Sequence, residues 1–302
     1  MSSRRCSVVF VILSSLFTQA SLGQDLSGSL DSLFMTLQHA RFEWVEAKGV
    51  SDRAAMRVPV NLDGNKGWFQ LDTGLDVTLF YGDIPGDRKW EHHDGMYRVP
   101  KFDIGDIHLG STWIRSSRET DTEGEVIGSL GLDLLVGHFL LIDYPRRRLA
   151  LMMPGDAPSW LLRRTSWTPA VIRDAKFFLT VVLGGKSITG LFFDTGASAF
   201  NITVDSAKWV ELTGRSGSDA ATTRWNVTSW GKEATAVGAP AQGPLVIGSA
   251  RITDPLVFYL QEQPKLFAQW PFPATGLVGN APFWDQVVIM DMGIRPRFGL
   301  VR

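Results

Sequence analysis

Two short segments of the sequence end in the same three residues, Asp-Thr-Gly. They are Phe69–Gly74 and Leu191–Gly196, and in both an apolar run leads directly into the aspartate. A single copy reads equally well as a strand that ends in a turn, because Asp and Gly favour turns. Two copies in matching context predict that Asp72 and Asp194 come together. Two adjacent carboxyl groups share one proton more readily than both ionise, and such a pair can activate a water molecule.

The surroundings of the two segments match at further points. Each is followed later in the chain by a three-residue segment that ends in an apolar residue and a glycine. These segments are Ser129–Gly131 in the first half and Leu277–Gly279 in the second. Apolar segments that end at Asp143 and Asp291 follow at the same distance beyond these glycines. The runs between are short, rich in Val, Ile, Phe and Trp, and broken by Gly, Pro, Asn and Asp, which is typical of β-structure. The internal repeat therefore predicts an all-β chain of two duplicated lobes.

Each half resembles a lobe of the pepsin and retropepsin superfamily of aspartic proteases. The resemblance depends on the apolar-apolar-Asp-Thr-Gly pattern and the later glycine, and it covers residues 56–302. It implies a bilobal pepsin-like fold of two retropepsin-like β lobes, with the active-site cleft between them. It also implies an endopeptidase in which Asp72 and Asp194 activate a water that attacks the peptide bond directly.

The same resemblance assigns supporting roles to the rest of the two loops. Thr73 and Thr195 are expected to hydrogen-bond across the lobe interface. Gly74 and Gly196 are expected to leave room for the turns and to expose amides near the carboxylates. No cofactor is needed for this chemistry, and none is expected.

The residues after each motif depart from the pepsin pattern, which usually has Ser or Thr there. Leu75-Asp76 follows the first motif and Ala197-Ser198 the second. Fewer hydroxyl donors to the ionised form should raise the apparent pKa values of the pair, so we expect a mildly acidic optimum. Asp76 and Ser198 are candidate substrate contacts; a structural ion pair is the alternative for Asp76.

A lid over the cleft is expected between Trp90 and Val99, where Asp94-Gly95 is a good hairpin turn. Tyr97 is the candidate flap tyrosine that would contact substrate. An ordinary exposed hairpin is the alternative for this segment.

The sequence predicts an exported protein. Two arginines precede an apolar stretch and then small residues, the pattern of a signal peptide, although an uncleaved anchor is the alternative. The single cysteine, Cys6, lies inside this segment, so the mature chain has no disulfide and a bacterial periplasmic or extracellular location is favoured. The predicted divisions are a signal peptide at 1–23, an extension or short pro-segment at 24–55, an N-terminal lobe at 56–153, a linker at 154–169 and a C-terminal lobe at 170–302.

Charge and composition exclude some partners. The formal net charge is -1, so no basic field favours nucleic acid. No apolar run beyond the signal is long enough to span a membrane. His92-His93 lacks supporting ligands, so no metal is expected. The expected partner is a peptide or protein substrate, and a monomer is expected because both aspartates lie in one chain. A non-catalytic peptide-binding protein on the same scaffold, and a structural β protein, are the alternatives.

Overall fold

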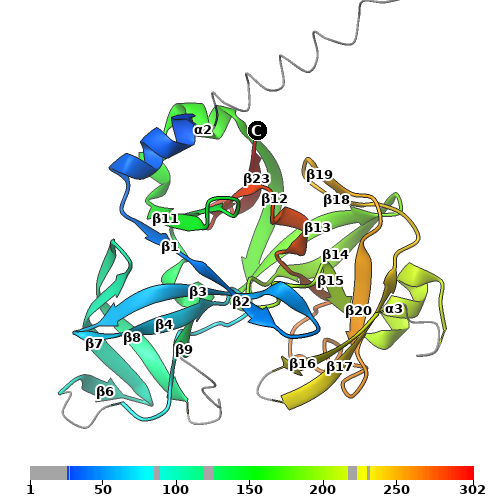
Figure 1. Cartoon of the computed structure of the whole chain (residues 1–302), viewed down its shortest axis with the longest axis horizontal. Helices are drawn as coiled ribbons and strands as arrows, with labels where there is room; N and C mark the ends of the chain where they lie inside the picture. Colours follow the sequence, from blue (N-terminus) through cyan, green and yellow to red (C-terminus); the bar gives the residue numbers. More distant parts are fainter. Residues whose placement is uncertain (1–25, 27, 85–88, 118–125, 217–222, 230–231) are drawn as a thin grey trace, which may run out of the picture.

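A computed structural model of the protein describes residues 26, 28–84, 89–117, 126–216, 223–229 and 232–302. The predicted signal peptide at 1–23 lies outside the described residues. The described chain is mostly β-strand, arranged in two large mixed sheets with a few short helices (Figure 1). The expectation of an all-β chain is confirmed at this level.

The smaller sheet is made by residues of the N-terminal half. Its strands are β2 Glu43–Ala47, β3 Ser51–Leu62, β4 Asn65–Leu71, β5 Leu79–Tyr81, β6 Glu91–His93, β7 Met96–Ile104, β8 Ile107–Ser117 and β9 Val126–Leu130. They lie in the order β2-β3-β4-β9-β5-β8-β7-β6, and β3 also pairs with β7. Because β3 pairs with β7, the six strands β3, β4, β9, β5, β8 and β7 form a closed ring around an apolar core.

The larger sheet has 15 strands and extends across the molecule. Its strands are β1 His39–Arg41, β10 Phe139–Asp143, β11 Arg148–Met152, β12 Thr165–Arg173, β13 Lys176–Leu183, β14 Lys186–Phe193, β15 Ile202–Val204, β16 Thr223–Ser229, β17 Lys232–Pro240, β18 Leu245–Ile247, β19 Ala250–Ile252, β20 Leu256–Leu260, β21 Gly276–Val278, β22 Val287–Asp291 and β23 Arg297–Val301. The main path is β1-β11-β10-β22-β23-β12-β13-β14-β21-β15-β20-β17-β16, with β18 between β13 and β19 off this path.

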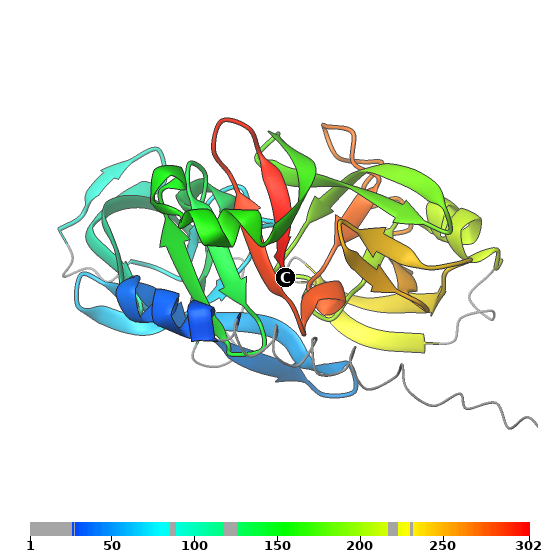
Figure 2. The ribbon, with the colours of Figure 1, turned by 90° about the horizontal axis from the view of Figure 1, so that it is seen from above.

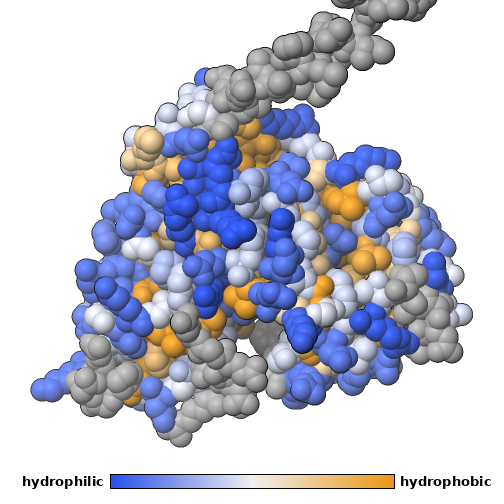
Figure 3. Space-filling model, viewed as in Figure 1, coloured by the Kyte–Doolittle hydropathy of each residue, from blue (hydrophilic) through white to orange (hydrophobic). Residues whose placement is uncertain are grey.

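Helices are short and peripheral. They are η1 Leu132–Leu134, η2 Pro154–Asp156, α2 Ser159–Arg163, α3 Ser206–Thr213 and η4 Ala281–Phe283, and residues 28–36 are also helical. No helix in the described ranges is long and apolar enough to cross a membrane. Polar side chains cover most of the face seen in Figure 3, with apolar residues in small groups between them.

Within the residues that the structure describes, one strand pair joins the two halves of the chain. Strand β10 pairs antiparallel with β22, with Leu141 opposite Ile289, and every residue of both strands is buried. Figure 2 shows β22 and β23, in red, between the blue and cyan strands of the N-terminal half and the yellow-green and yellow strands of the C-terminal half. The halves therefore share a continuous sheet.

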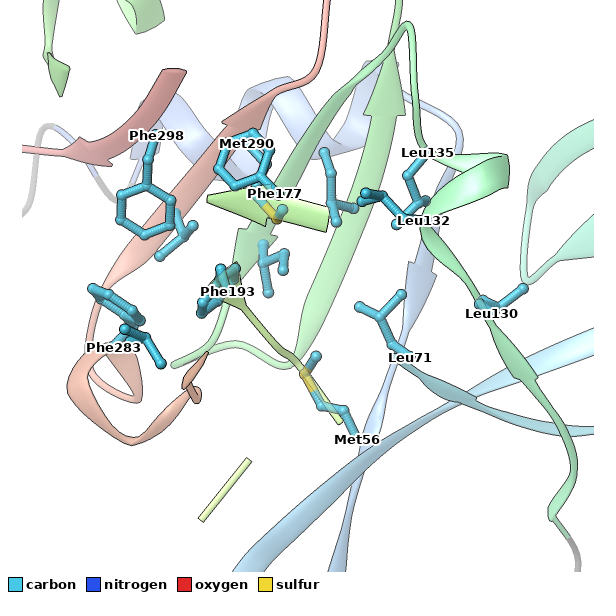
Figure 4. Packing of buried hydrophobic residues seen from close by; sticks show 14 of the residues in the cluster. Met56, Leu71, Leu130, Leu132, Leu135, Phe177, Phe193, Phe283, Met290 and Phe298 are labelled. Atoms are coloured by element: carbon cyan, nitrogen blue, oxygen red, sulfur yellow. The ribbon is translucent and has the colours of Figure 1, made fainter. Parts of the chain in front are cut away.

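The core is shared as well. Leu71 and Leu130, which end β4 and β9, lie in the same buried cluster as Phe193, Phe283 and Phe298 (Figure 4). Leu71 and Phe193 are the residues directly before the two aspartates. Packing of these side chains therefore fixes the positions at which both Asp-Thr-Gly loops begin.

Residues ahead of the predicted N-terminal lobe take part in the fold. Leu30 and Phe34, on the helical segment 28–36, are buried against the larger sheet, and β1 pairs with β11. At the other predicted boundary, β12 begins inside the predicted linker at 154–169 and runs on into the following lobe. The linker thus contributes a hydrogen-bonded strand.

Candidate active site

The two Asp-Thr-Gly loops meet face to face. Asp72 follows β4 and Asp194 follows β14. A methyl group added at Gly74 would lie 2.6 Å from Cγ of Asp194, and one added at Gly196 would lie 2.6 Å from Cγ of Asp72. Each glycine therefore faces the opposite carboxyl group, and the two carboxyl groups are close enough to influence each other's protonation. The predicted meeting of the two motifs is present in the structure.

The threonines hold the two loops together by four reciprocal hydrogen bonds. The Thr73 hydroxyl donates to the carbonyl of Phe193 at 2.9 Å and accepts the amide of Thr195 at 3.0 Å. The Thr195 hydroxyl donates to the carbonyl of Leu71 at 2.9 Å and accepts the amide of Thr73 at 3.0 Å. Both threonines are fully buried, so these bonds are shielded from water.

Backbone amides support each carboxylate. The amide of Gly74 donates to Oδ1 of Asp72 at 3.0 Å, and that of Gly196 donates to Oδ1 of Asp194 at 2.8 Å. Ala197 adds a longer amide contact to Asp194 at 3.3 Å. These donors favour the charged form of each group.

Burial works in the opposite direction. It raises the pKa of Asp72 well above the ordinary value, and the negative charge of Asp194 raises it further. Burial also raises the pKa of Asp194, while the amides of Gly196 and Ala197 and the charge of Lys176 oppose the rise. Since the two groups interact strongly, the proton they hold belongs to the pair. The arrangement can therefore present an acid and a base side by side.

Two residues beside the pair were not predicted as site residues. Tyr81 hydrogen-bonds through its hydroxyl to Oγ of Ser129 at 2.6 Å, and burial, together with the charge of Asp72, raises the pKa of Tyr81. Lys176, the first residue of β13, is only 6% exposed, and its ammonium group contacts the carbonyl of Ala175 at 3.4 Å. Burial lowers the pKa of Lys176, and the charges of nearby aspartates oppose that effect.

The residues after the motifs have different surroundings. Asp76 is exposed, and it is the aspartate with the largest electrostatic effect on Lys176. Ser198 is 0% exposed, and its hydroxyl accepts a hydrogen bond from the side-chain amide of Asn280 at 3.1 Å. With no exposed surface, Ser198 is better placed to hold its loop than to touch a substrate.

Tyr97 lies on the expected hairpin. β6 and β7 are joined by a turn at Asp94 and Gly95, both with positive φ, and Tyr97 pairs with His92. The Tyr97 ring stacks on that of His92, with a centroid separation of 4.5 Å, and is half-buried. The hairpin exists, whereas its action as a lid stays a prediction.

A second layer of polar groups lies behind each loop. In the N-terminal half, the Thr78 hydroxyl donates to Asp133 at 2.8 Å and accepts the amide of Gly131 at 3.0 Å. In the C-terminal half, Asn280 donates to the carbonyl of Thr195 at 3.0 Å and accepts the Tyr144 hydroxyl at 2.8 Å. The loops are thus backed by different side chains in the two halves.

Among the described residues, no group of three or more His, Cys, Asp or Glu side chains could hold a metal ion. The polar groups that converge at the site are the two carboxyl groups, the backbone amides, Tyr81 and Lys176.

Comparison with solved structures finds proteins of similar fold. The structure is similar to the crystal structure of basic 7S globulin from soybean, with a TM-score of 0.51 and 10% sequence identity. The match covers 88% of this chain and 96% of that chain. No protein-family model matches the sequence, and a search of curated proteins found no match. At this identity the similarity concerns the fold alone.

Proposed function

We propose that this protein is an aspartic endopeptidase that cleaves peptide bonds with a water activated by Asp72 and Asp194. The observation that carries the proposal is the close approach of the two carboxyl groups, each facing the glycine of the other loop. Juxtaposed carboxyl groups repel one another when both are ionised, so an arrangement that holds them together without another role would only reduce stability.

We further propose that the chain is a bilobal, pepsin-like duplication. Support comes from strand pairings that correspond in the two halves. β4 lies parallel to β9 and β14 parallel to β21, directly before each aspartate. β5 pairs parallel with β8 and antiparallel with β9, and β15 pairs in the same two ways with β20 and β21. The fold likeness to basic 7S globulin over most of both chains agrees with this proposal.

The mechanism follows from one proton shared by two carboxyl groups. The ionised member removes a proton from the water as its oxygen bonds to the carbonyl carbon, and the protonated member donates to the carbonyl oxygen. The member that received the proton then gives it to the amide nitrogen as the C–N bond breaks. The other member regains its proton from the tetrahedral intermediate, so the pair returns to its starting state.

Activity needs the pair to hold one proton. Burial raises the pKa of both aspartates, which moves the upper limit of that singly protonated range to higher pH. We therefore infer a mildly acidic optimum instead of a strongly acidic one. The signal-peptide pattern supports a role on exported or external proteins, and the single-chain pair supports action as a monomer.

The test is a digest of a peptide library by the purified mature protein, read by mass spectrometry from about pH 2 to pH 8. We expect cuts by the wild type that disappear in both Asp72→Asn and Asp194→Asn. Asp254→Asn, an exposed aspartate elsewhere in the C-terminal half, is the matched control and should cut normally. Folded protein that binds peptides and cuts none of them at any pH would overturn the proposal in favour of a peptide-binding protein.

A further inference from the structure

Polar side chains lie on one face of the N-terminal sheet, beside the first Asp-Thr-Gly loop. In the parallel pair of β4 and β9, Gln70 is the partner of Ser129, and Leu71 is the partner of Leu130. Successive side chains of a strand point to opposite faces of a sheet. Since Leu71 and Leu130 are buried in the core, Gln70 and Ser129 lie on the face turned away from it.

Two contacts place this face at the aspartate pair. The side-chain amide of Gln70 donates to the carbonyl of Gly196 at 3.4 Å, and Gly196 is the glycine that faces the carboxyl group of Asp72. The Tyr81 hydroxyl lies 2.6 Å from Oγ of Ser129. Gln70 therefore reaches from its own strand to the opposite loop, and Ser129 holds the Tyr81 hydroxyl on the same face.

These groups have hydrogen-bonding capacity that the described part of the chain does not use. Gln70 carries two amide hydrogens and a carbonyl oxygen, and its one contact within that part, at 3.4 Å, is long for a hydrogen bond. In the pair of hydroxyls, one donates to the other, which leaves one hydroxyl hydrogen for a further partner. Gln70 and Tyr81 are both partly exposed, so a bound molecule can contact them.

The second half has apolar residues at the matching positions, two residues before its aspartate and two before its later glycine. Phe192 and Leu277 are partners there, as Gln70 and Ser129 are in the first half. Both are buried in an apolar cluster that includes Trp270, whose ring centroid lies 5.2 Å from that of Phe192. The first half therefore offers accessible hydrogen-bonding groups, whereas the second half covers the same face with its own side chains.

The arginine next to this face is directed to other partners. Arg57 is opposite Gln70 in the β3–β4 pair. Its guanidinium group lies 4.5 Å from the ring centroid of Trp68 and donates to the carboxylate of Glu43 at 2.8 Å and 3.1 Å. The hydrogen-bonding groups nearest the aspartates on this face are therefore an amide and two hydroxyls, all uncharged.

The chemistry of the pair favours a neutral ligand at such a place. An anionic side chain would be repelled by the ionised aspartate. A cationic side chain would favour ionisation of both aspartates and so remove the shared proton. A neutral side chain with a donor and an acceptor can bond to the amide and the hydroxyls without disturbing the pair.

We propose that Gln70, Ser129 and Tyr81 form a polar subsite that selects a neutral hydrogen-bonding side chain, such as Gln, Asn or Ser, next to the cleaved bond. The inference rests on the proposed peptidase function. Gln70 and Tyr81 bond to the substrate side chain, and Ser129 positions the Tyr81 hydroxyl. An apolar side chain of the same size is disfavoured, because it would take water from these polar groups and offer no partner in return.

Synthetic peptides test the preference. The sequence that the library digest shows to be cut best is remade with Gln, Met, Lys or Glu at each of the two residues flanking the cut. Gln and Met have the same length and differ in hydrogen bonding. At one of these positions, we expect kcat/KM to be about tenfold higher with Gln than with Met, and lower still with Lys or Glu. Cleavage as fast or faster with any of these three, at both positions, would overturn the proposal.

Two variants test the residues. Gln70→Met and Tyr81→Phe each remove a hydrogen-bonding group and should bring the Gln-to-Met ratio of kcat/KM close to one, by slowing cleavage of the Gln peptide alone. Gln286→Met, at an exposed site after η4, and Tyr259→Phe, on β20, are the matched controls and should keep the wild-type ratio. An unchanged ratio in both folded subsite variants would overturn the proposal, because a merely structural role does not depend on the peptide.

Binding separates this inference from the proposed function. Fluorescence anisotropy of labelled Gln and Met peptides with folded Asp194→Asn measures the preference without cleavage. If the wild type cuts nothing, the peptides are made from the library sequence that binds best, with Gln and Met placed at each position in turn. Tighter binding with Gln, lost when Gln70→Met is added, would then support the subsite and remove the peptidase. A peptidase that treats Gln and Met alike keeps the function and removes the subsite, and a protein that neither cuts nor binds peptides overturns both.

Discussion

The two Asp-Thr-Gly loops are alike where they touch and different where they do not. The reciprocal bonds of Thr73 and Thr195 differ little in length, and each glycine faces the opposite carboxyl group at the same distance. Beyond this shared centre, the polar side chains that support the two loops differ. The comparison teaches that symmetry is kept where the two carboxyl groups meet and is not needed in the residues behind the loops.

The residues behind the loops continue this contrast. On one side, Thr78 links Asp133 to the amide of Gly131. On the other side, Asn280 links Tyr144 to the loop that carries Asp194. Both arrangements use buried hydrogen bonds to hold a turn, but the donors and acceptors come from different residue types. The support of each loop can therefore be altered separately.

Substitution of either glycine should have the largest effect. In Gly74→Ala or Gly196→Ala, the new methyl group would lie 2.6 Å from the opposite carboxyl carbon, so the two carboxyl groups must move apart. A displacement near 1 Å at a catalytic group can reduce the rate about 100-fold. We expect at least that loss in kcat/KM for both variants in the peptide assay.

Gly155→Ala is the control for this pair, since a methyl group there meets nothing within 4 Å. A much smaller loss at one of the two Asp-Thr-Gly glycines would contradict the symmetry of the centre that we describe.

The threonines come next. Thr73→Val and Thr195→Val each remove a hydroxyl and leave a buried amide and a buried carbonyl without that partner. Buried polar groups left unpaired cost about 1–3 kcal/mol each, so for two such groups we expect a loss of roughly 2–6 kcal/mol in the free energy of unfolding. Urea denaturation should give nearly equal losses for the two variants.

Thr189→Val, on the exposed face of β14, should leave that free energy within about 0.5 kcal/mol of wild type. Strongly unequal losses at Thr73 and Thr195 would show that the two halves do not contribute equally to the link.

Asn280→Ala should affect one loop only. It removes the donor to the Thr195 carbonyl and the acceptor for the Tyr144 hydroxyl, at a cost of about 1–3 kcal/mol. We expect the carboxyl signal of Asp194 to shift in NMR spectra, with that of Asp72 nearly unchanged. Asn226→Ala, an exposed site on β16, is the control, and equal shifts of both signals would contradict separate support.

The smallest effect should be a gain of stability. Burial raises the pKa of both aspartates in the folded protein, so the folded state holds protons that the unfolded state has released. Stability from these groups is therefore present below the ordinary aspartate pKa and is lost as pH rises through the folded-state values. In Asp72→Asn and Asp194→Asn, the substituted group does not ionise, so it no longer reduces the stability of the folded protein as pH rises.

We expect each variant to raise Tm by a few degrees at pH 7 and to lose that advantage near pH 3. Thermal unfolding at several pH values measures this difference in Tm between each variant and the wild type. An unchanged Tm at pH 7 in both folded variants would contradict this prediction.

The sequence predicted the centre of the site better than its surroundings. Asp-Thr-Gly is a local signal, and two copies with matching neighbours were enough to predict that Asp72 and Asp194 meet. Lys176 was missed because a lysine at the start of a strand normally reads as solvent-exposed. Its burial depends on how other segments pack around the start of β13, which is a long-range feature.

Ser198 shows the same limit in the other direction. Its place directly after an Asp-Thr-Gly loop suggested a substrate contact, yet its hydroxyl accepts a hydrogen bond from Asn280, which lies far along the chain. Spacing along the sequence indicates which loop a residue belongs to, but it does not indicate which side of that loop the side chain occupies. The β-rich class, which depends on composition and turn residues, needed no such information.

The pairing of β10 with β22 has a consequence for biosynthesis. When the ribosome has completed the first half of the protein, β10 has β11 on one side and an open edge on the other, and four of its five residues are apolar. The strand that covers this edge is among the last to be made. A nascent chain therefore carries an aggregation-prone edge through most of its synthesis, and a product truncated before Val287 keeps it permanently.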